Sequence, residues 1–233
     1  MELFGTELKL LENGRTQKEI ATQNMGSKRT ISKYNLEYFQ KDSTDGVYDI
    51  PSIYPTIYKP KQLVGFNYLN SAASEVGIHF YLDDYQIERF WNRPEFYMDK
   101  LKRFDCVLSP DFSLYRDMPL AMMIWNVYRS RLLGQMMQQS GLTVIPTVSW
   151  ADTDSFDFCF DGLPSNSTLS ISTIGVKKNN EANQMWQRGV LEMIDRLHPK
   201  QLLVYGGKVD FVYPDNVDVV YYENDNVKRL RGL

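Results

Sequence analysis

The sequence has few cysteines, no long apolar run and no excess of positive charge, and each shortage excludes a class of protein. Two cysteines, Cys106 and Cys159, cannot form a disulfide framework, and we expect both to be reduced and buried because they lie in apolar runs. No run approaches the roughly 18 apolar residues of a membrane helix, and residues 1–14 lack the features of a signal peptide. The formal charge of -3 argues against a basic surface that holds duplex nucleic acid. We therefore expect a cytoplasmic protein that does not associate with membranes.

What is present is an alternation of strand-type and helix-type segments. With 233 residues, 43% of them hydrophobic, the chain can bury a sizeable core. Seven short strands are predicted, over residues 63–69, 77–84, 104–111, 143–150, 167–175, 201–207 and 216–223. Several of these runs are nearly continuous in apolar residues, which is typical of a parallel sheet covered on both faces. The sequence thus predicts an α/β fold with mainly parallel strands in βαβ units, arranged as a small irregular (β/α) barrel, with an open doubly wound sheet as the alternative.

Helices are predicted over residues 84–104 with a break at Pro94, over 120–139, and over 181–197. The second is apolar on most sides, so we expect it to be largely buried. The third has one apolar face, made of Trp186, Gly189, Val190, Met193 and Leu197. Burial of the second helix would place Arg129 and Arg131 in or near the interior, where each guanidinium must find a carboxylate or an anionic ligand.

The first 60 residues differ in texture, which suggests a division into an N-terminal arm or small module (1–60) and an α/β domain (61–233). Residues 12–34 are polar and basic, and TQKEIATQNMGSKRTISKY resembles a DNA-binding helix-turn-helix. It departs from that pattern at Asn24, where an apolar residue is expected, and at Gly26, which is one place late. A polar arm is the alternative interpretation.

Polar residues collect where the predicted strands end, which is where parallel α/β proteins bind ligands. Asp111 and either Asp83 or Asp84 could divide acid and base roles, or bind a divalent metal through their oxygens. The candidate ligand-binding residues are Ser109, Arg129, Trp150, Asp161 and Tyr205. The structural alternatives are that strands need polar residues where they leave the core, and that Asp111 or Asp117 forms a salt bridge with Arg129 or Arg131. No standard nucleotide-binding loop is present.

Six sequence blocks carry a resemblance to a known family: HFYLDDYQIERFWNRP, SPDFSLYRDMPLAMMIWNVYRSRLLG, VIPTVSW, FDFCFDGLP, SISTIG and LVYGG. Together they resemble, over about residues 47–223, a bacterial and phage family known only as a domain of unknown function, frequent in phages and integrative mobile elements. The resemblance implies a genomic setting and no reaction. It also implies that SPDFS, FDG and YG are signature blocks, here residues 109–113, 160–162 and 205–206.

Two functions of different classes are consistent with the sequence. The first is an enzyme acting on a phosphate-bearing ligand, a nucleotide or nucleic acid, with Arg129 clamping anionic oxygens and Trp150 or Tyr205 stacking. The second is a non-catalytic module of a mobile element that binds DNA or a phage or host protein. A cleft that holds Asp111 and Arg129 would favour the enzyme, and a dry core around both would favour the binding module.

Overall fold

The computed structural model describes residues 28–224 and divides the chain into two compact units, 1–40 and 41–233. In the described part of the first unit, helix α2 (Lys28–Lys33) exposes Lys28, Arg29 and Lys33 and buries Ile31; a short 3-10 helix, η1 (Leu36–Tyr38), follows. The first helix of the predicted helix-turn-helix lies outside the described residues. A domain boundary near residue 60 stays a prediction.

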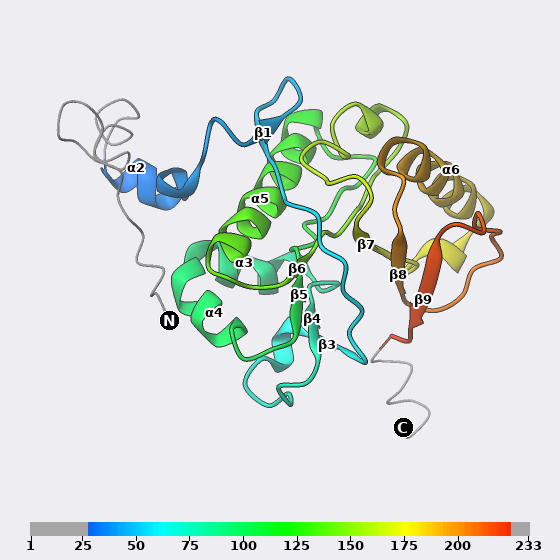
Figure 1. The fold of residues 1–233 in the computed structure, drawn as a ribbon. Coiled ribbons are helices and arrows are strands. Elements are labelled where there is room, and N and C mark those ends of the chain that lie inside the picture. Colours follow the sequence, from blue (N-terminus) through cyan, green and yellow to red (C-terminus); the bar gives the residue numbers. More distant parts are fainter. Residues whose placement is uncertain (1–27, 225–233) are drawn as a thin grey trace. The chain divides into compact units, whose positions relative to one another are not determined.

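The described part of the second unit, residues 41–224, contains seven parallel strands, one for each predicted strand segment (Figure 1). A four-stranded sheet consists of β3 (Leu63–Gly65), β4 (Gly77–His79), β5 (Cys106–Leu108) and β6 (Val144–Ile145), and a three-stranded sheet of β7 (Thr168–Ser172), β8 (Gln201–Tyr205) and β9 (Asp218–Tyr222). Both sheets follow chain order, without the reversal of a doubly wound sheet. The predicted α/β class with parallel strands is confirmed.

Among residues 28–224, a single β-bridge, Thr147 to Ser170, joins the two sheets. Two backbone hydrogen bonds accompany it: Val148 N–H donates to the Ser170 carbonyl and Ser170 N–H donates to the Pro146 carbonyl, both over 2.8 Å. At the other margin, among the described residues, no strand pairing closes the sheet from β9 back to β3. We call the bridged margin the seam between the sheets.

A buried cluster contains residues of both sheets although the strand pairing does not close among the described residues. Its members come from both sheets and are Leu63, Tyr81, Cys106, Leu108, Ile145, Leu203, Tyr205 and Tyr222. The Tyr222 hydroxyl donates to the Pro60 carbonyl over 2.6 Å, so the end of β9 lies beside the chain that leads into β3. The strands therefore curl around a shared interior, as barrel strands do, without forming a closed barrel.

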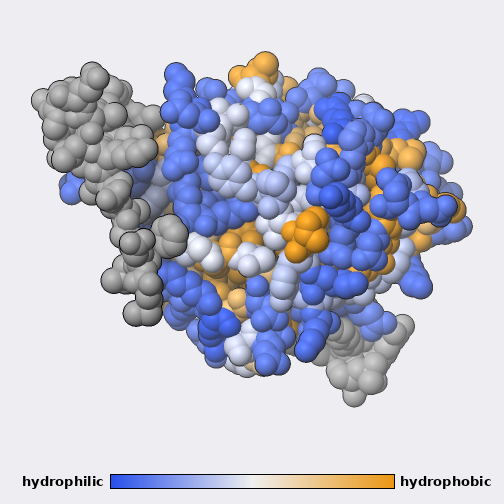
Figure 2. Space-filling model, viewed as in Figure 1, coloured by the Kyte–Doolittle hydropathy of each residue, from blue (hydrophilic) through white to orange (hydrophobic). Residues whose placement is uncertain are grey.

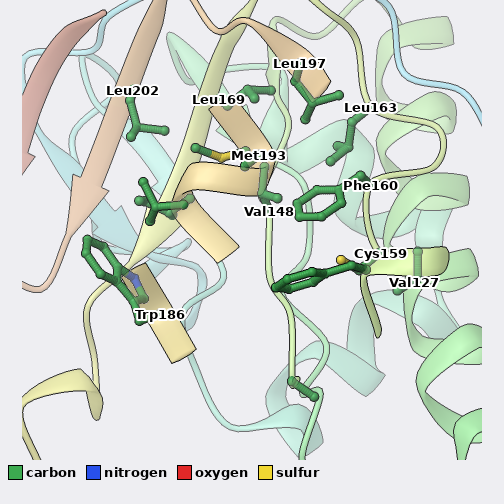
Figure 3. Packing of buried hydrophobic residues seen from close by; sticks show 14 of the residues in the cluster. Val127, Val148, Cys159, Phe160, Leu163, Leu169, Trp186, Met193, Leu197 and Leu202 are labelled. Carbon is green, nitrogen blue, oxygen red and sulfur yellow. The ribbon is translucent and has the colours of Figure 1, made fainter. Parts of the chain in front are cut away.

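Four longer helices connect the strands: α3 (Asp84–Asn92), α4 (Pro94–Leu101), α5 (Leu120–Gln139) and α6 (Asn180–Leu197). Pro94 begins α4, which confirms the predicted break. Helix α5 is largely buried and α6 buries the five residues predicted for its apolar face. Figure 3 shows this face, including Trp186 and Met193, in the main core with Leu169 and Leu202 of the neighbouring strands.

The two arginines predicted in the interior are both buried, and they are satisfied differently. Arg129 pairs with the carboxylate of Glu88, as predicted for a buried guanidinium. Arg131 instead donates to the backbone carbonyls of Thr147 and Cys159, over 3.2 and 2.8 Å, and of Asp161. The expectation of a carboxylate or ligand was wrong for Arg131, because carbonyls at strand and loop ends already supply acceptors in the interior.

Residues 41–60 belong to the larger unit and run along it as a hairpin, β1 (Thr44–Asp45) with β2 (Ile50–Pro51), followed by an extended segment. Ile53 N–H donates to the Gly162 carbonyl over 2.9 Å. Gly162 has a φ of 71°, and a side chain there would meet the Pro51 carbonyl oxygen. The glycine of the FDG block is therefore required by the backbone and by this close approach.

The face of the molecule in Figure 2 is mostly hydrophilic, with hydrophobic side chains in scattered groups. Within residues 28–224, no helix has the length and apolar character needed to cross a bilayer.

Candidate functional site

A cleft opens where the strands end, which we call the strand-end cleft. It has two lobes with cavity volumes of about 440 and 570 Å³, within the range of small-molecule sites. Both lobes are lined by Tyr81, Asp111, Leu114, Tyr115, Ser149, Trp150, Ser172 and Ile174. These residues follow β4, β5, β6 and β7, or end β7, so the carboxyl ends of strands from both sheets meet here.

Asp111 lines both lobes and directly follows Pro110, two residues after the end of β5. The residue is partly exposed, but its carboxyl oxygen Oδ1 is buried and has no hydrogen-bond partner among the described residues. The pKa of the Asp111 carboxyl is raised to about 7, chiefly by burial and also by the charge of Asp84, while the hydrogen bond to Ser149 and the charge of Arg131 oppose the rise. A carboxyl that is part protonated near neutral pH can either donate or accept a proton.

A hydrogen-bonded loop fixes the backbone beside Asp111. The Asp84 carboxylate accepts from the backbone N–H and the hydroxyl of Ser113, over 3.1 and 2.8 Å. On the other side, Asn126 Nδ2 donates to the Ser113 carbonyl over 2.7 Å. Asp84 therefore orients the loop and does not line either lobe, whereas Asp83 is exposed and lines the larger one.

Arg129 supports the same loop from behind. Its guanidinium donates to Asn126 Oδ1 over 2.6 Å, pairs with Glu88, and lies over the Phe112 ring at 3.9 Å from the ring centre. With 7% of its surface exposed, Arg129 lines neither lobe. A cleft that holds both Asp111 and Arg129 was expected for the enzyme, and a dry core around both for the binding module. The structure shows neither arrangement, because Asp111 lines the cleft and Arg129 does not.

Aromatic rings form the floor and one wall of the cleft. The rings of Tyr81 and Tyr205 stack with centres 5.0 Å apart, and His79 lies 4.2 Å from Tyr205. The backbone N–H of Tyr81 donates to His79 Nδ1, so in the neutral imidazole the proton is on Nε2. Trp150 forms a wall of both lobes and packs directly on Gly189 of α6, where a side chain would overlap the indole.

Two other predicted ligand-binding residues lie away from the cleft lining. The Ser109 hydroxyl accepts from Thr147 N–H over 2.8 Å, and Thr147 Oγ1 donates back to the Ser109 carbonyl, which ties the ends of β5 and β6 together. The Asp161 carboxylate lies against Gly46, and burial followed by the charge of Asp45 raises its pKa. Of the predicted residues, the cleft brings together Asp83, Asp111, Trp150 and Tyr205.

Residues 42–223 match the family described as Domain of unknown function (DUF4417). The chain belongs to this family. It is similar to the Gene 1 protein of Mycobacterium phage L5, with 43% identity over 167 residues that make up 70% of this chain and 73% of the phage protein. It is also similar to the Gene 1 protein of Mycobacterium phage D29, with 41% identity over 167 residues, 70% of this chain and 62% of that protein. No solved structure matches the chain.

These matches confirm the predicted phage family, and the structure gives its three sequence blocks distinct places in this DUF4417 chain. SPDFS supplies Asp111 at the centre of the cleft, and YG supplies Tyr205 on its floor. Gly206 has a φ of 107°, and a side chain there would meet the Thr173 hydroxyl. FDG supplies Gly162, which lies against Pro51 of β2, and none of its three residues lines the cleft.

The sequence left the cofactor unknown, with a divalent metal as one of two roles for the acidic residues. Within the part of the chain that the structure describes, no three His, Cys, Asp or Glu side chains are grouped as a metal site. Asp84 already accepts two hydrogen bonds from Ser113 and does not line the cleft, so it is not poised beside Asp111 as a second ligand. The geometry therefore adds no support to metal binding by this DUF4417 chain.

Proposed function

We propose that this chain is an enzyme that binds an uncharged polar ligand in the strand-end cleft and transfers a proton through Asp111. One observation carries the proposal: a buried carboxyl oxygen without a hydrogen-bond partner belongs to a residue that lines both lobes. Such an oxygen costs folding free energy, and perturbed carboxyl groups in clefts are typical of catalytic sites. The proposal keeps the predicted acid–base role of Asp111 and assigns loop support to Asp84 and Arg129.

The charge of the lining supports an uncharged ligand rather than the phosphate-bearing one expected from the sequence. Asp83 contributes negative charge to the larger lobe, and Asp111 adds to it when ionised, while the described lining of this lobe includes no Lys or Arg. In the smaller lobe the cation among the described lining residues is Arg116, which is paired with Glu181. A phosphate would therefore meet carboxylates without an unpaired cation, which is electrostatically unfavourable.

The test is turnover in a mixture of small metabolites, followed by mass spectrometry. We expect the wild-type protein to consume at least one compound, and Asp111→Asn to consume it about 10² to 10⁴ times more slowly, as for the loss of a general acid or base. Leu191→Ala is the matched control, since Leu191 is exposed on α6 and does not line the cleft. Equal rates for wild type and Asp111→Asn, or no compound consumed, would reject the enzyme.

The binding module of a mobile element is a second candidate, supported by the exposed cations Lys28, Arg29 and Lys33 on α2. If these side chains contact phosphates, replacing all three with alanine in the full chain should weaken DNA binding. Each lost contact should reduce the dependence of log affinity on log salt by about 0.9. An unchanged salt dependence would remove this candidate.

A further inference from the structure

The two lobes of the strand-end cleft share the eight lining residues named above, Asp111 and Trp150 among them, and differ in the residues that complete each lobe. The smaller, which we call the apolar lobe, is completed largely by nonpolar side chains: Val148, Ala151, Val176, Met185 and Trp186. The larger, which we call the polar lobe, is completed by groups that form hydrogen bonds, including Asn67, His79, Asp83, Gln86 and Ser113. A single ligand that fills both lobes must therefore have one apolar part and one polar part.

The apolar lobe is suited to a flat ring. Trp150 lies directly on Gly189, so the indole forms a wall backed by the helix rather than a freely rotating side chain. Tyr115 and Ile174 line the same space and are 57% and 50% exposed, which places them at its opening. Indole and phenol faces stack well on planar heterocycles, whatever the identity of the heterocycle.

The polar lobe is suited to a group with several hydroxyls. Asn67 and Gln86 carry amides that donate and accept, and the Ser113 hydroxyl, which donates to Asp84, can still accept. A sugar hydroxyl also donates and accepts, so it can match either atom of each amide. Asp83 adds a carboxylate acceptor at the exposed edge of this lobe.

We propose that the ligand is a nucleoside-like glycoside, with an aromatic heterocycle in the apolar lobe, its sugar in the polar lobe, and the bond between them beside Asp111. This inference rests on the proposed function, because it assumes that one ligand occupies both lobes of the cleft. It deepens that function by naming the class of ligand. It also places the group that transfers protons next to the glycosidic bond rather than at either end of the molecule.

Calorimetry with the full-length chain tests this class with defined probes: adenosine, guanosine, cytidine and uridine, their free bases, ribose, and their 5′-monophosphates. We expect at least one nucleoside to bind tenfold or more tightly than both its free base and ribose, because only the nucleoside reaches both lobes. Its 5′-monophosphate should bind no more tightly than the nucleoside. A monophosphate that binds tenfold more tightly, or four nucleosides without binding at millimolar concentration, would overturn the class.

Variants on each side of Asp111 locate the two parts of the ligand. Met185→Ala, which alters the lining of the apolar lobe alone, should lower nucleoside affinity and leave ribose binding unchanged, since an apolar contact with the ring is lost. Gln86→Ala should lower the affinity for nucleoside and leave that for free base unchanged. Leu191→Ala should change neither, and equal losses for base and ribose in both variants would contradict the assignment of the lobes.

The two proposals can fail separately. If the metabolite assay finds turnover that depends on Asp111 and the compound is not a glycoside, the ligand class is wrong and the enzyme stands. If nucleosides bind in the cleft and neither they nor any metabolite is consumed, the enzyme is wrong and the ligand class stands.

Discussion

The buried carboxyl of Asp111 should make the stability of the protein depend on pH, and Asp111→Asn measures how strongly. Asparagine has nearly the shape of the protonated carboxyl and cannot ionise. The folded protein holds the pKa of Asp111 at about 7, above the ordinary value of 3.8, chiefly through burial. Between these two values the folded state keeps a proton that the unfolded chain has lost, so stability falls as pH rises.

The size of the effect follows from the same two values. At about 1.4 kcal/mol per pH unit, the interval between 3.8 and about 7 corresponds to roughly 4 kcal/mol as an upper bound. Because the residue is partly exposed, solvent should reduce this, and we expect roughly 2 to 4 kcal/mol. The variant should thus match the wild type near pH 4 and exceed its free energy of unfolding by that amount near pH 8.

Urea unfolding followed by circular dichroism at the two pH values provides the measurement. Asp83→Asn is the matched control, because it removes a carboxylate from the same cleft at an exposed position, where substitutions change stability by about 0.5 kcal/mol or less. A loss of about 3 kcal/mol or more in Asp111→Asn at pH 8 would refute the reasoning. It would mean that the carboxylate is ionised and satisfied by a buried partner, and that Asp111 maintains the fold.

Three further outcomes follow from the packing. Gly189→Ala should displace the Trp150 indole and destabilise the protein by about 1 to 3 kcal/mol. We expect a lower urea midpoint and altered tryptophan fluorescence, and unchanged fluorescence would contradict the contact between Trp150 and Gly189. Arg131→Met should lower the free energy of unfolding by about 3 kcal/mol or more, because three backbone carbonyls lose their hydrogen-bond donor. Urea unfolding measures this change, and a decrease of less than about 1 kcal/mol would show that those carbonyls find other partners. Cys106 and Cys159 should not react with iodoacetamide in the native protein at pH 8, since burial raises the pKa of each thiol to about 12, and both should react after unfolding in urea. Mass spectrometry measures the alkylation, and rapid alkylation of the native protein would contradict this prediction.

The fold was largely predictable because its strong signals are local. The break at Pro94 follows from a ring that cannot continue a helix, and the buried face of α6 follows from helical periodicity. The number of parallel strands followed from short apolar runs between turns. Whether the sheet closes was not predictable, because that depends on the pairing of β9 with β3, which are far apart in the chain.

The candidate site was predictable only in part, since position after a strand does not determine which way a side chain points. Asp111 and Ser109 both follow β5, yet one lines the cleft and the other ties two strands together. Arg129 was assigned to the ligand, but its partner, Glu88, lies on another helix that the sequence could not place beside it. Tyr81 was missed as a cleft residue because an aromatic side chain in an apolar run gives no sign that it borders a cavity.

The seam between the two sheets has a mechanical consequence. Each sheet is held by continuous ladders, whereas the bridge between them consists of one residue pair and two backbone hydrogen bonds. Asp111 approaches the cleft from one side of this line and Ser172 from the other. Local opening starts where the fewest bonds must break, so the amides of Val148 and Ser170 should exchange with solvent deuterium before those in the middle of β8. Flexing along the seam would then change the width of the cleft while the hydrogen bonds within each sheet stay intact.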